Sequence, residues 1–457
     1  MKLIYNVNDK PSFGKLIICA IQQILAIMAA TIAVPMIVGN GMSAAAAMFG
    51  AGVGTLVYLL FTKFKSPVFL GSSFAFIGSM AAAFAGATSM ALGYLGLIVG
   101  ALMAGLVYVV IAIVIKLVGV NWINKLMPPV VIGPTVALIG LSLAGAAIND
   151  VFSYGAKDGN GAFIMGPAIW ASLICALVTL VVVILCSVYG KKMARLIPFI
   201  IGILAGYAVA AIFTIIGNCA GIDSIKIIDF SVFTSYMFPE GAVSLQTFLS
   251  LPDFTFLTAI EGVAEFDVQY LTTLFVAYVP VAFVVFAEHI ADHKNLSSII
   301  EHDLLEDPGL SRTLLGDGVG SIFGAFFGGC PNTTYGESVG CVAITKNASI
   351  YTVLVAALGC ILISFITPLV AFVDSIPGCV MGGVCITLYG FIAVSGLKMI
   401  QKVNLESDAN LFTVAAILIP GIGGMAMSIG KVTITAIACS LILGIIVNII
   451  VSKATDR

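Results

Sequence analysis

Apolar stretches of about 20 residues follow one another along almost the whole 457-residue chain. An α-helix needs a stretch of that length to cross the hydrocarbon core of a bilayer. Because every backbone polar group in lipid must be bonded within the protein, such stretches fold as spanning helices. With 60% hydrophobic residues, 9% charged residues and a mean hydropathy of +1.16, the chain is more apolar than a soluble core requires. The sequence therefore predicts an all-α polytopic membrane protein.

Fourteen transmembrane segments can be placed by this criterion. The first is expected to be a retained span, because the apolar run from Leu16 to Val38 is too long for the core of a signal peptide. The predicted segments lie at 14–38, 43–62, 67–86, 91–117, 122–147, 166–188, 196–219, 270–290, 310–329, 332–346, 350–373, 376–397, 408–427 and 431–452.

The basic residues orient these segments. With the N-terminus in the cytoplasm, 17 of the 20 Lys and Arg residues fall on the cytoplasmic side, and only Lys157, Lys226 and Lys431 remain outside. An excess of Lys and Arg in cytoplasmic loops sets the orientation of a membrane protein. We therefore expect a multi-pass protein of the cytoplasmic membrane with both termini in the cytoplasm. The net charge of −2 gives no indication of nucleic-acid binding.

One long polar insertion, residues 221–269, separates the seventh segment from the eighth. It is expected outside the cell, as a solvated cap or a contact between subunits. Because it divides the chain into seven plus seven segments, an odd number, the second half should enter the membrane with inverted topology. Its seven acidic residues face a single lysine, Lys226: Asp223, Asp229, Glu240, Asp253, Glu261, Glu265 and Asp267.

Two predicted segments at corresponding places in the halves are interrupted. The third opens with Pro67-Val68-Phe69-Leu70-Gly71-Ser72-Ser73-Phe74, and the tenth follows Pro331 with Asn332-Thr333-Thr334-Tyr335-Gly336-Glu337. Irregular backbone at membrane depth is tolerated only where protein or a wet cavity satisfies it. Paired interruptions of this kind are the best sequence indication of the binding site in a transporter.

Two carboxylates accompany the interruptions. Glu337 lies in the tenth segment, and Glu288 closes the apolar run from Val279 to Ala287. Ionised carboxylates accept hydrogen bonds, whereas the free N–H groups of half-helices donate them. A small planar ligand that carries both C=O and N–H groups, lying beside Phe74, Tyr335 or Tyr389, matches this set. A nucleobase has these properties, and a sugar or an inorganic anion matches less well.

Proton coupling is a further hypothesis. Asp292 lies four residues after Glu288 on the same helical face, and such a carboxylate pair should bind and release a proton near neutral pH. Sodium coupling through the same groups stays open. The spacing of the three histidines, His289, His293 and His302, does not favour a metal site, and no cofactor is expected. Asp317 is expected to cap the cytoplasmic end of the ninth segment.

Several motifs resemble one known family, the nucleobase–ascorbate transporters, and most closely its bacterial uracil permeases. The resemblance implies fourteen spans in a seven-plus-seven inverted repeat, with short antiparallel strands in segments three and ten. It further implies a core domain (14–117 and 270–373), a gate domain (122–219 and 376–452) and a homodimer joined through the gates. The matching motifs are Gly71-Ser72-Ser73-Phe74-Ala75-Phe76, Ala287-Glu288-His289-Ile290, Asp307-Pro308-Gly309-Leu310, Asn332-Thr333-Thr334-Tyr335-Gly336-Glu337, Ala343-Ile344-Thr345 and Val380-Met381-Gly382-Gly383-Val384.

The resemblance also assigns roles to single residues. It implies that Glu288 and Glu337 bind the base, while the remaining substrate-binding candidates line or border the pocket: Ser73, Phe74, Tyr335, Gly336 and Tyr389. The proton-coupling candidates are Glu288, His289 and Asp292. Two positions depart from the family pattern, since Asp292 replaces a second histidine and Ser338 replaces an asparagine. Glu337 favours uracil-like over purine substrates.

The leading hypothesis is a secondary transporter that imports uracil, or a similar pyrimidine base, by proton symport with alternating access. A xanthine or purine permease of the same family is the nearest alternative, and an anion exchanger of the same fold is less favoured. An enzyme is not expected, because no nucleophile, base and orienting group lie together on neighbouring segments.

Overall fold

The computed structural model describes residues 3–119, 121–191, 193–238, 241–429 and 432–455. Among these residues, eight helices are long and apolar enough to cross a membrane, and four shorter apolar helices accompany them. The all-α membrane architecture is thus confirmed. Every predicted segment contains a helix, but several helices are short, so the count of fourteen crossings stays a prediction. Lys431 and Glu240 lie outside the described residues.

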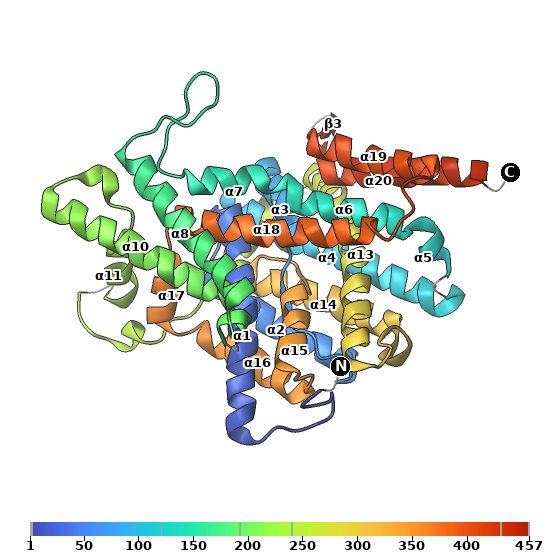
Figure 1. Ribbon diagram of the computed structural model, residues 1–457, viewed down its shortest axis with the longest axis horizontal. Coiled ribbons are helices and arrows are strands. Elements are labelled where there is room, and N and C mark those ends of the chain that lie inside the picture. The colour runs from blue at the N-terminus through green and yellow to red at the C-terminus, as the bar shows by residue number, and fades with distance from the viewer. Residues whose placement is uncertain (1–2, 120, 192, 239–240, 430–431, 456–457) are drawn as a thin grey trace. The chain divides into compact units, whose positions relative to one another are not determined.

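The chain divides into two compact units, Met1–Ser142 with Asp253–Ile361 and Phe391–Arg457, and Leu143–Pro252 with Leu362–Gly390. The helices of the first unit are α1 (Phe13–Val38), α2 (Ala44–Phe61), η1 (Phe74–Phe76), α3 (Ile77–Gly86), α4 (Met90–Val118), α5 (Asn121–Leu126), α6 (Pro129–Ser142), α12 (Thr255–Ala259), η4 (Ile260–Glu265), α13 (Val268–Ile300), η5 (Leu305–Gly309), α14 (Leu310–Gly328), α15 (Gly336–Thr345), α19 (Asp408–Ile422) and α20 (Ala436–Thr455) (Figure 1).

The second unit holds α7 (Ala144–Val151), α8 (Pro167–Tyr189), α9 (Met193–Leu196), α10 (Pro198–Ala220), η2 (Asp223–Ile225), α11 (Ser231–Met237), η3 (Leu245–Thr247) and α17 (Thr367–Asp374). α16 (Ile350–Ile363) and α18 (Gly378–Ile400) have residues in both units. Within the second unit the polar insertion is bonded to the chain that leads into α17. Ser250 N–H donates to the Phe365 carbonyl at 3.0 Å, and Thr367 N–H donates to the Phe248 carbonyl at 3.0 Å.

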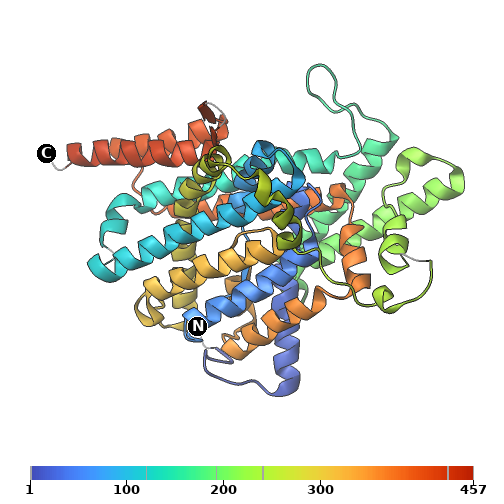
Figure 2. The same cartoon turned by 180° about the vertical axis from the view of Figure 1, so that it is seen from behind.

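Helices α2 and α14 of the first unit lie side by side with their backbones in contact (Figure 2). A Cβ added at Gly50 would lie 2.5 Å from the carbonyl oxygen of Gly324, and one at Gly54 would lie 2.7 Å from that of Gly320. Small residues permit this approach between membrane helices, where dispersion contacts and not hydrophobic burial drive packing. The two interrupted segments pack against this α2–α14 pair.

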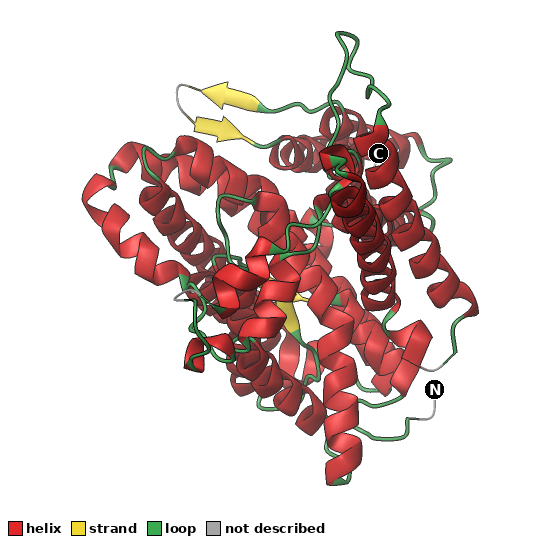
Figure 3. Cartoon of the chain, turned by 90° about the vertical axis from the view of Figure 1, so that its left-hand side faces the viewer, coloured by secondary structure: helices red, strands yellow, loops and turns green. Residues whose placement is uncertain are grey.

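The two interrupted segments meet as predicted. β1 (Leu70–Ser72) pairs antiparallel with β2 (Asn332–Thr334), with Gly71 opposite Thr333, and all six strand residues are buried. Figure 3 shows this short pair enclosed by helices, whereas β3 (Met427–Ile429) and β4 (Val432–Ile434) form a separate hairpin. The predicted antiparallel strands in segments three and ten are therefore confirmed.

Candidate functional site

Each of the two strands leads directly into the N-terminus of a short helix. β1 is followed by η1 and α3, β2 is followed by α15, and neither Ser73 nor Tyr335 caps the helix that it precedes with its side chain. The first N–H groups of a helix have no partner within the helix and carry partial positive charge. Both helix starts are therefore able to donate hydrogen bonds to carbonyl or anionic oxygens of a ligand.

Tyr335 fastens the two strands to each other. Its ring lies over Gly71, where an added Cβ would be 2.4 Å from two ring carbons, and its hydroxyl donates to the Ser72 carbonyl at 2.7 Å. The backbone ladder continues beyond the strands, since Tyr335 N–H donates to the Phe69 carbonyl at 3.2 Å. Tyr335 is 4% exposed. In this structure its side chain therefore mainly stabilises the β1–β2 pair.

Helix α13 brings the other predicted acidic residues to this place. It continues to Ile300, past the predicted end at residue 290, so Glu288 lies well inside the helix and not at its end. Glu288 and Glu337 are half-buried and lie near enough to interact electrostatically. Carboxylates from α13 and α15 thus converge at the start of α15.

Asp292 contacts the interrupted segment directly. Its Oδ2 accepts a hydrogen bond from the Thr334 hydroxyl at 3.0 Å, and its Oδ1 lies 3.7 Å from where a Cβ on Gly336 would be. Asp292 is buried, whereas Gly336 at the start of α15 is exposed. The residue that departs from the family pattern therefore joins α13 to β2.

The remaining predicted residues lie at different places. Phe74 is buried at the start of η1, and Ser73 is fully buried immediately before it. Tyr389 lies on α18 in the second unit and is 2% exposed there. Its contribution to the same pocket stays a prediction.

A buried His–Asp pair adjoins the acidic residues, and sequence reasoning misplaced one partner. Asp317 was expected to cap a helix end, which is wrong because α14 begins seven residues earlier, at Leu310, and Asp317 is fully buried. Its Oδ2 lies 2.7 Å from Nδ1 of His289, whose Nε2 lies 3.0 Å from the Thr313 hydroxyl. A carboxylate in an apolar span, flanked by glycines, was the signal for such a partner.

His293 extends these polar contacts toward α2. Its Nδ1 lies 2.8 Å from the His289 carbonyl oxygen, and its Nε2 lies 2.6 Å from the Tyr58 hydroxyl, which donates to Ser66 at 2.7 Å. The rings of His289 and His293 have centroids 4.0 Å apart. Within the described chain no three His, Cys, Asp or Glu side chains are grouped to hold a metal ion.

Ser338 and Gln23 were not predicted as partners. The Ser338 hydroxyl accepts from the Phe69 N–H at 3.0 Å and from the side-chain amide of Gln23 on α1. One small hydroxyl thus joins α15, the segment before β1 and the first helix. The serine that replaces the family's asparagine therefore helps to stabilise the β1–β2 pair.

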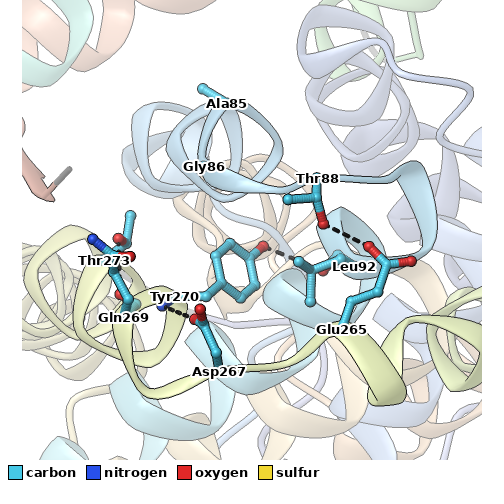
Figure 4. A pocket seen from close by; sticks show the side chains of 9 residues that line it. All are labelled: Ala85, Gly86, Thr88, Leu92, Glu265, Asp267, Gln269, Tyr270 and Thr273. Carbon is cyan, nitrogen blue, oxygen red and sulfur yellow. Dashed lines mark hydrogen bonds between the residues drawn. The ribbon is translucent and has the colours of Figure 1, made fainter.

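A separate cavity of about 340 Å³ opens at the start of α13 (Figure 4). Its lining includes Glu265, which accepts from the Thr88 hydroxyl at 2.5 Å, and Asp267, which accepts from the Tyr270 N–H at 2.6 Å. Because a helix rises about 1.5 Å per residue, Glu288 lies roughly 30 Å further along α13. None of the predicted site residues lines this cavity.

The same fold occurs in solved transporters. The transmembrane domain of a cyanobacterial bicarbonate transporter, BicA, superposes with a TM-score of 0.63 at 15% identity, covering 98% of this chain and 100% of that one. The murine Solute Carrier 26 family member A9 anion transporter, in the inward-facing state, gives a TM-score of 0.62 at 14% identity, with 98% and 69% covered. At these identities the likeness concerns the fold alone.

Sequence comparison identifies the family. The Permease family profile matches residues 14–430. A uracil permease of Bacillus caldolyticus is 37% identical over 98% of this chain and 95% of its own length, and one of Bacillus subtilis (strain 168) is 35% identical over 100% and 97%. A uracil permease of Escherichia coli (strain K12) is 33% identical over 97% and 93%. The chain therefore belongs to this permease family, the nucleobase–ascorbate transporters, and is a membrane transporter and not an enzyme.

Proposed function

We propose that this permease imports uracil, or a similar pyrimidine base, across the cytoplasmic membrane by proton symport with alternating access. The observation that carries the proposal is the convergence of Glu288, Asp292 and Glu337 beside the start of α15. Similarity to proteins named uracil permease over nearly the full length supports the choice of base.

The donors and acceptors of uracil match those of the site. Uracil carries two N–H groups and two carbonyl oxygens on one planar ring. Glu288 and Glu337 accept from the ring N–H groups, while backbone N–H groups at the start of α15 donate to the carbonyl oxygens, and the backbone at Phe74 and Gly336 lines the base. Ser73 and the aromatic rings of Phe74, Tyr335 and Tyr389 border the ring. A free anion lacks these N–H donors and would be repelled by the carboxylates.

The same carboxylates provide for coupling. In a site of low dielectric constant, neighbouring negative charges interact strongly, so the loaded site is most stable with a proton shared among Glu288 and Asp292, with His289 beside them. Substrate and proton then cross together between a core domain (14–117 and 270–373) and a gate domain (122–219 and 376–452). Both termini face the cytoplasm, and the gates of two copies form a homodimer.

Uptake of radiolabelled uracil by cells without their own permease tests the proposal. Glu288→Gln and Glu337→Gln each replace an acceptor-only group with one that also donates, so we expect uptake to fall at least about tenfold for the loss of one charged hydrogen bond. Glu261→Gln, at an exposed carboxylate distant in sequence from both, is the matched control and should transport normally. Normal uptake by both site variants would remove these residues from the mechanism.

Competition between bases tests which base is transported, and ion replacement tests which ion is coupled to transport. Unlabelled uracil should suppress uptake more than xanthine does, whereas the reverse result would favour a purine permease. Uptake should respond to an imposed pH gradient and persist when sodium is replaced. Uptake that requires sodium and ignores the pH gradient would contradict proton symport.

A further inference from the structure

A short helix outside the predicted membrane segments has an exposed apolar face. It comprises α12 and η4 together, residues 255–265, and is called here the 255–265 helix. One face packs on the protein through the buried residues Thr255, Ala259 and Gly262. Packing at Gly262 is close, since an added Cβ would lie 2.5 Å from the Leu92 backbone nitrogen at the start of α4. The helix is therefore firmly seated on the first unit.

The 255–265 helix also contacts the C-terminal end of α14. The ring of Phe256 stacks on Phe326 with centroids 4.8 Å apart and meets Phe327 edge to face at 5.9 Å. The 255–265 helix thus lies where α4 begins, where α14 ends and, three residues further along the chain, where α13 begins. The near ends of these three helices therefore meet at the 255–265 helix, as expected where helices leave the bilayer.

The outward face of the helix carries large aliphatic side chains. Leu257, Ile260 and Val263 are 57%, 71% and 56% exposed. Their spacing of three residues places them on one side, while the exposed residues Thr258 and Glu261 lie on the flank beside them. If the helix were surrounded by water, positions 257, 260 and 263 would carry polar side chains. The apolar face that they form therefore needs an apolar partner.

Exposed apolar side chains also occur on the first turns of α13, the membrane span that follows the 255–265 helix. Val268, Leu271 and Phe275 on the first turns of α13 are 78%, 36% and 55% exposed, as expected of side chains that face lipid. The lipid-facing side of α13 therefore begins three residues after the 255–265 helix ends. Acidic residues on the same segment, Glu261 and Glu265, disfavour an anionic membrane surface.

We propose that the 255–265 helix lies in the headgroup layer of the bilayer, with Leu257, Ile260 and Val263 inserted among the acyl chains of zwitterionic lipids. Its polar flank faces water, and its third side rests on α4 and α14. The Thr88–Glu265 hydrogen bond ties the helix to the turn between α3 and α4, so the lipid contact helps to fix the end of α3. This assignment is independent of the transported base.

Tryptophan fluorescence in reconstituted vesicles tests the assignment. Both native tryptophans are replaced by phenylalanine, and single tryptophans are introduced as Ile260→Trp and, as the adjacent control on the polar flank, Glu261→Trp. In phosphatidylcholine vesicles with bromine near the top of the acyl chains, Ile260→Trp should lose roughly half or more of its emission, because an interfacial helix buries its apolar face about 5–10 Å deep. Glu261→Trp should instead be quenched by aqueous iodide.

Other outcomes separate the alternatives. Iodide quenching of Ile260→Trp without bromolipid quenching would place the face in water and overturn the proposal. Protection from both quenchers would overturn it in favour of a protein cover, such as a second copy of the chain. Val263→Trp repeats the measurement one turn further on, so poor folding of one variant still leaves a decisive result. Addition of anionic lipid should reduce bromolipid quenching at both apolar positions.

Discussion

Gly71→Ala tests whether the β1–β2 pair depends on close contact between Gly71 and the Tyr335 ring. A Cβ at position 71 would lie 2.4 Å from two carbons of the Tyr335 ring and 2.9 Å from a third, whereas ordinary contacts begin near 3.4 Å. The ring cannot move without lengthening the 2.7 Å bond from its hydroxyl to the Ser72 carbonyl. Overpacking costs about 1–3 kcal/mol and a lost buried hydrogen bond about 1 kcal/mol, so we expect a destabilisation of about 2–4 kcal/mol.

The assay is the apparent melting temperature of detergent-purified protein, with and without uracil. Gly71→Ala should lower the apparent Tm by several degrees. It should also weaken the uracil-induced rise in Tm, because the displaced ring adjoins Gly336 at the start of α15. Gly340→Ala on α15 is the matched control, since an added Cβ there meets nothing within 4 Å and alanine favours the helix.

Two further variants divide the effect into its parts. Tyr335→Phe removes the hydroxyl but keeps the ring, so it should cost about 1 kcal/mol. Combining Gly71→Ala with Tyr335→Ala removes the collision and should be less destabilising than the sum of the two single changes. A wild-type Tm for Gly71→Ala, or an equal loss for Gly340→Ala, would refute the reasoning.

Three more predictions concern single contacts, each measured by apparent Tm. Asp317→Ala should destabilise by about 3 kcal/mol because it leaves Nδ1 of the buried His289 ring without its partner, and Asp317→Asn by less; equal values would contradict a specific pair. Ser338→Ala should cost about 1–3 kcal/mol by stranding two buried N–H groups, with Ser338→Thr milder. Hydrogen bonding to the Lys65 ammonium lowers the pKa of Asp307, so this exposed pair stabilises at neutral pH and loses its effect as pH falls through that pKa. Lys65→Met should therefore lower Tm slightly at neutral pH and not in strong acid.

The interruptions in segments three and ten were predictable from backbone chemistry. Proline followed by glycine and polar residues cannot continue a membrane helix, so the interruptions in segments three and ten could be inferred from Pro67 and Pro331 onward. The strands within them were implied by the resemblance to the family and not by this chemistry. The end of α13 could not be placed in this way. Hydropathy falls after residue 290, but nothing in the following residues breaks a helix, and α13 continues to Ile300.

Partners distant in the chain were also beyond the sequence. His289 and Asp317 are 28 residues apart, and Gln23 and Ser338 are 315 apart. A polar residue in an apolar span indicates that a partner residue exists. Which residue is the partner depends on how the helices are rotated against each other. The partner of Asp317 depends on how α13 and α14 pack, so the sequence around Asp317 alone does not distinguish a helix cap from a buried partner of His289.

The bond between Asp292 and Thr334 gives the proposed coupling a physical route. The Thr334 hydroxyl donates to Asp292 Oδ2 at 3.0 Å, and this bond joins the long helix α13 to β2, two residues before α15 begins. A hydrogen bond to an ionised carboxylate is roughly twice as strong as one to a neutral acid. If Asp292 carries the transported proton, its protonation therefore weakens the connection between α13 and the segment that presents Glu337. By linkage, any change that separates β2 from α13 then favours the protonated form by the same free energy, so position and proton occupancy control each other.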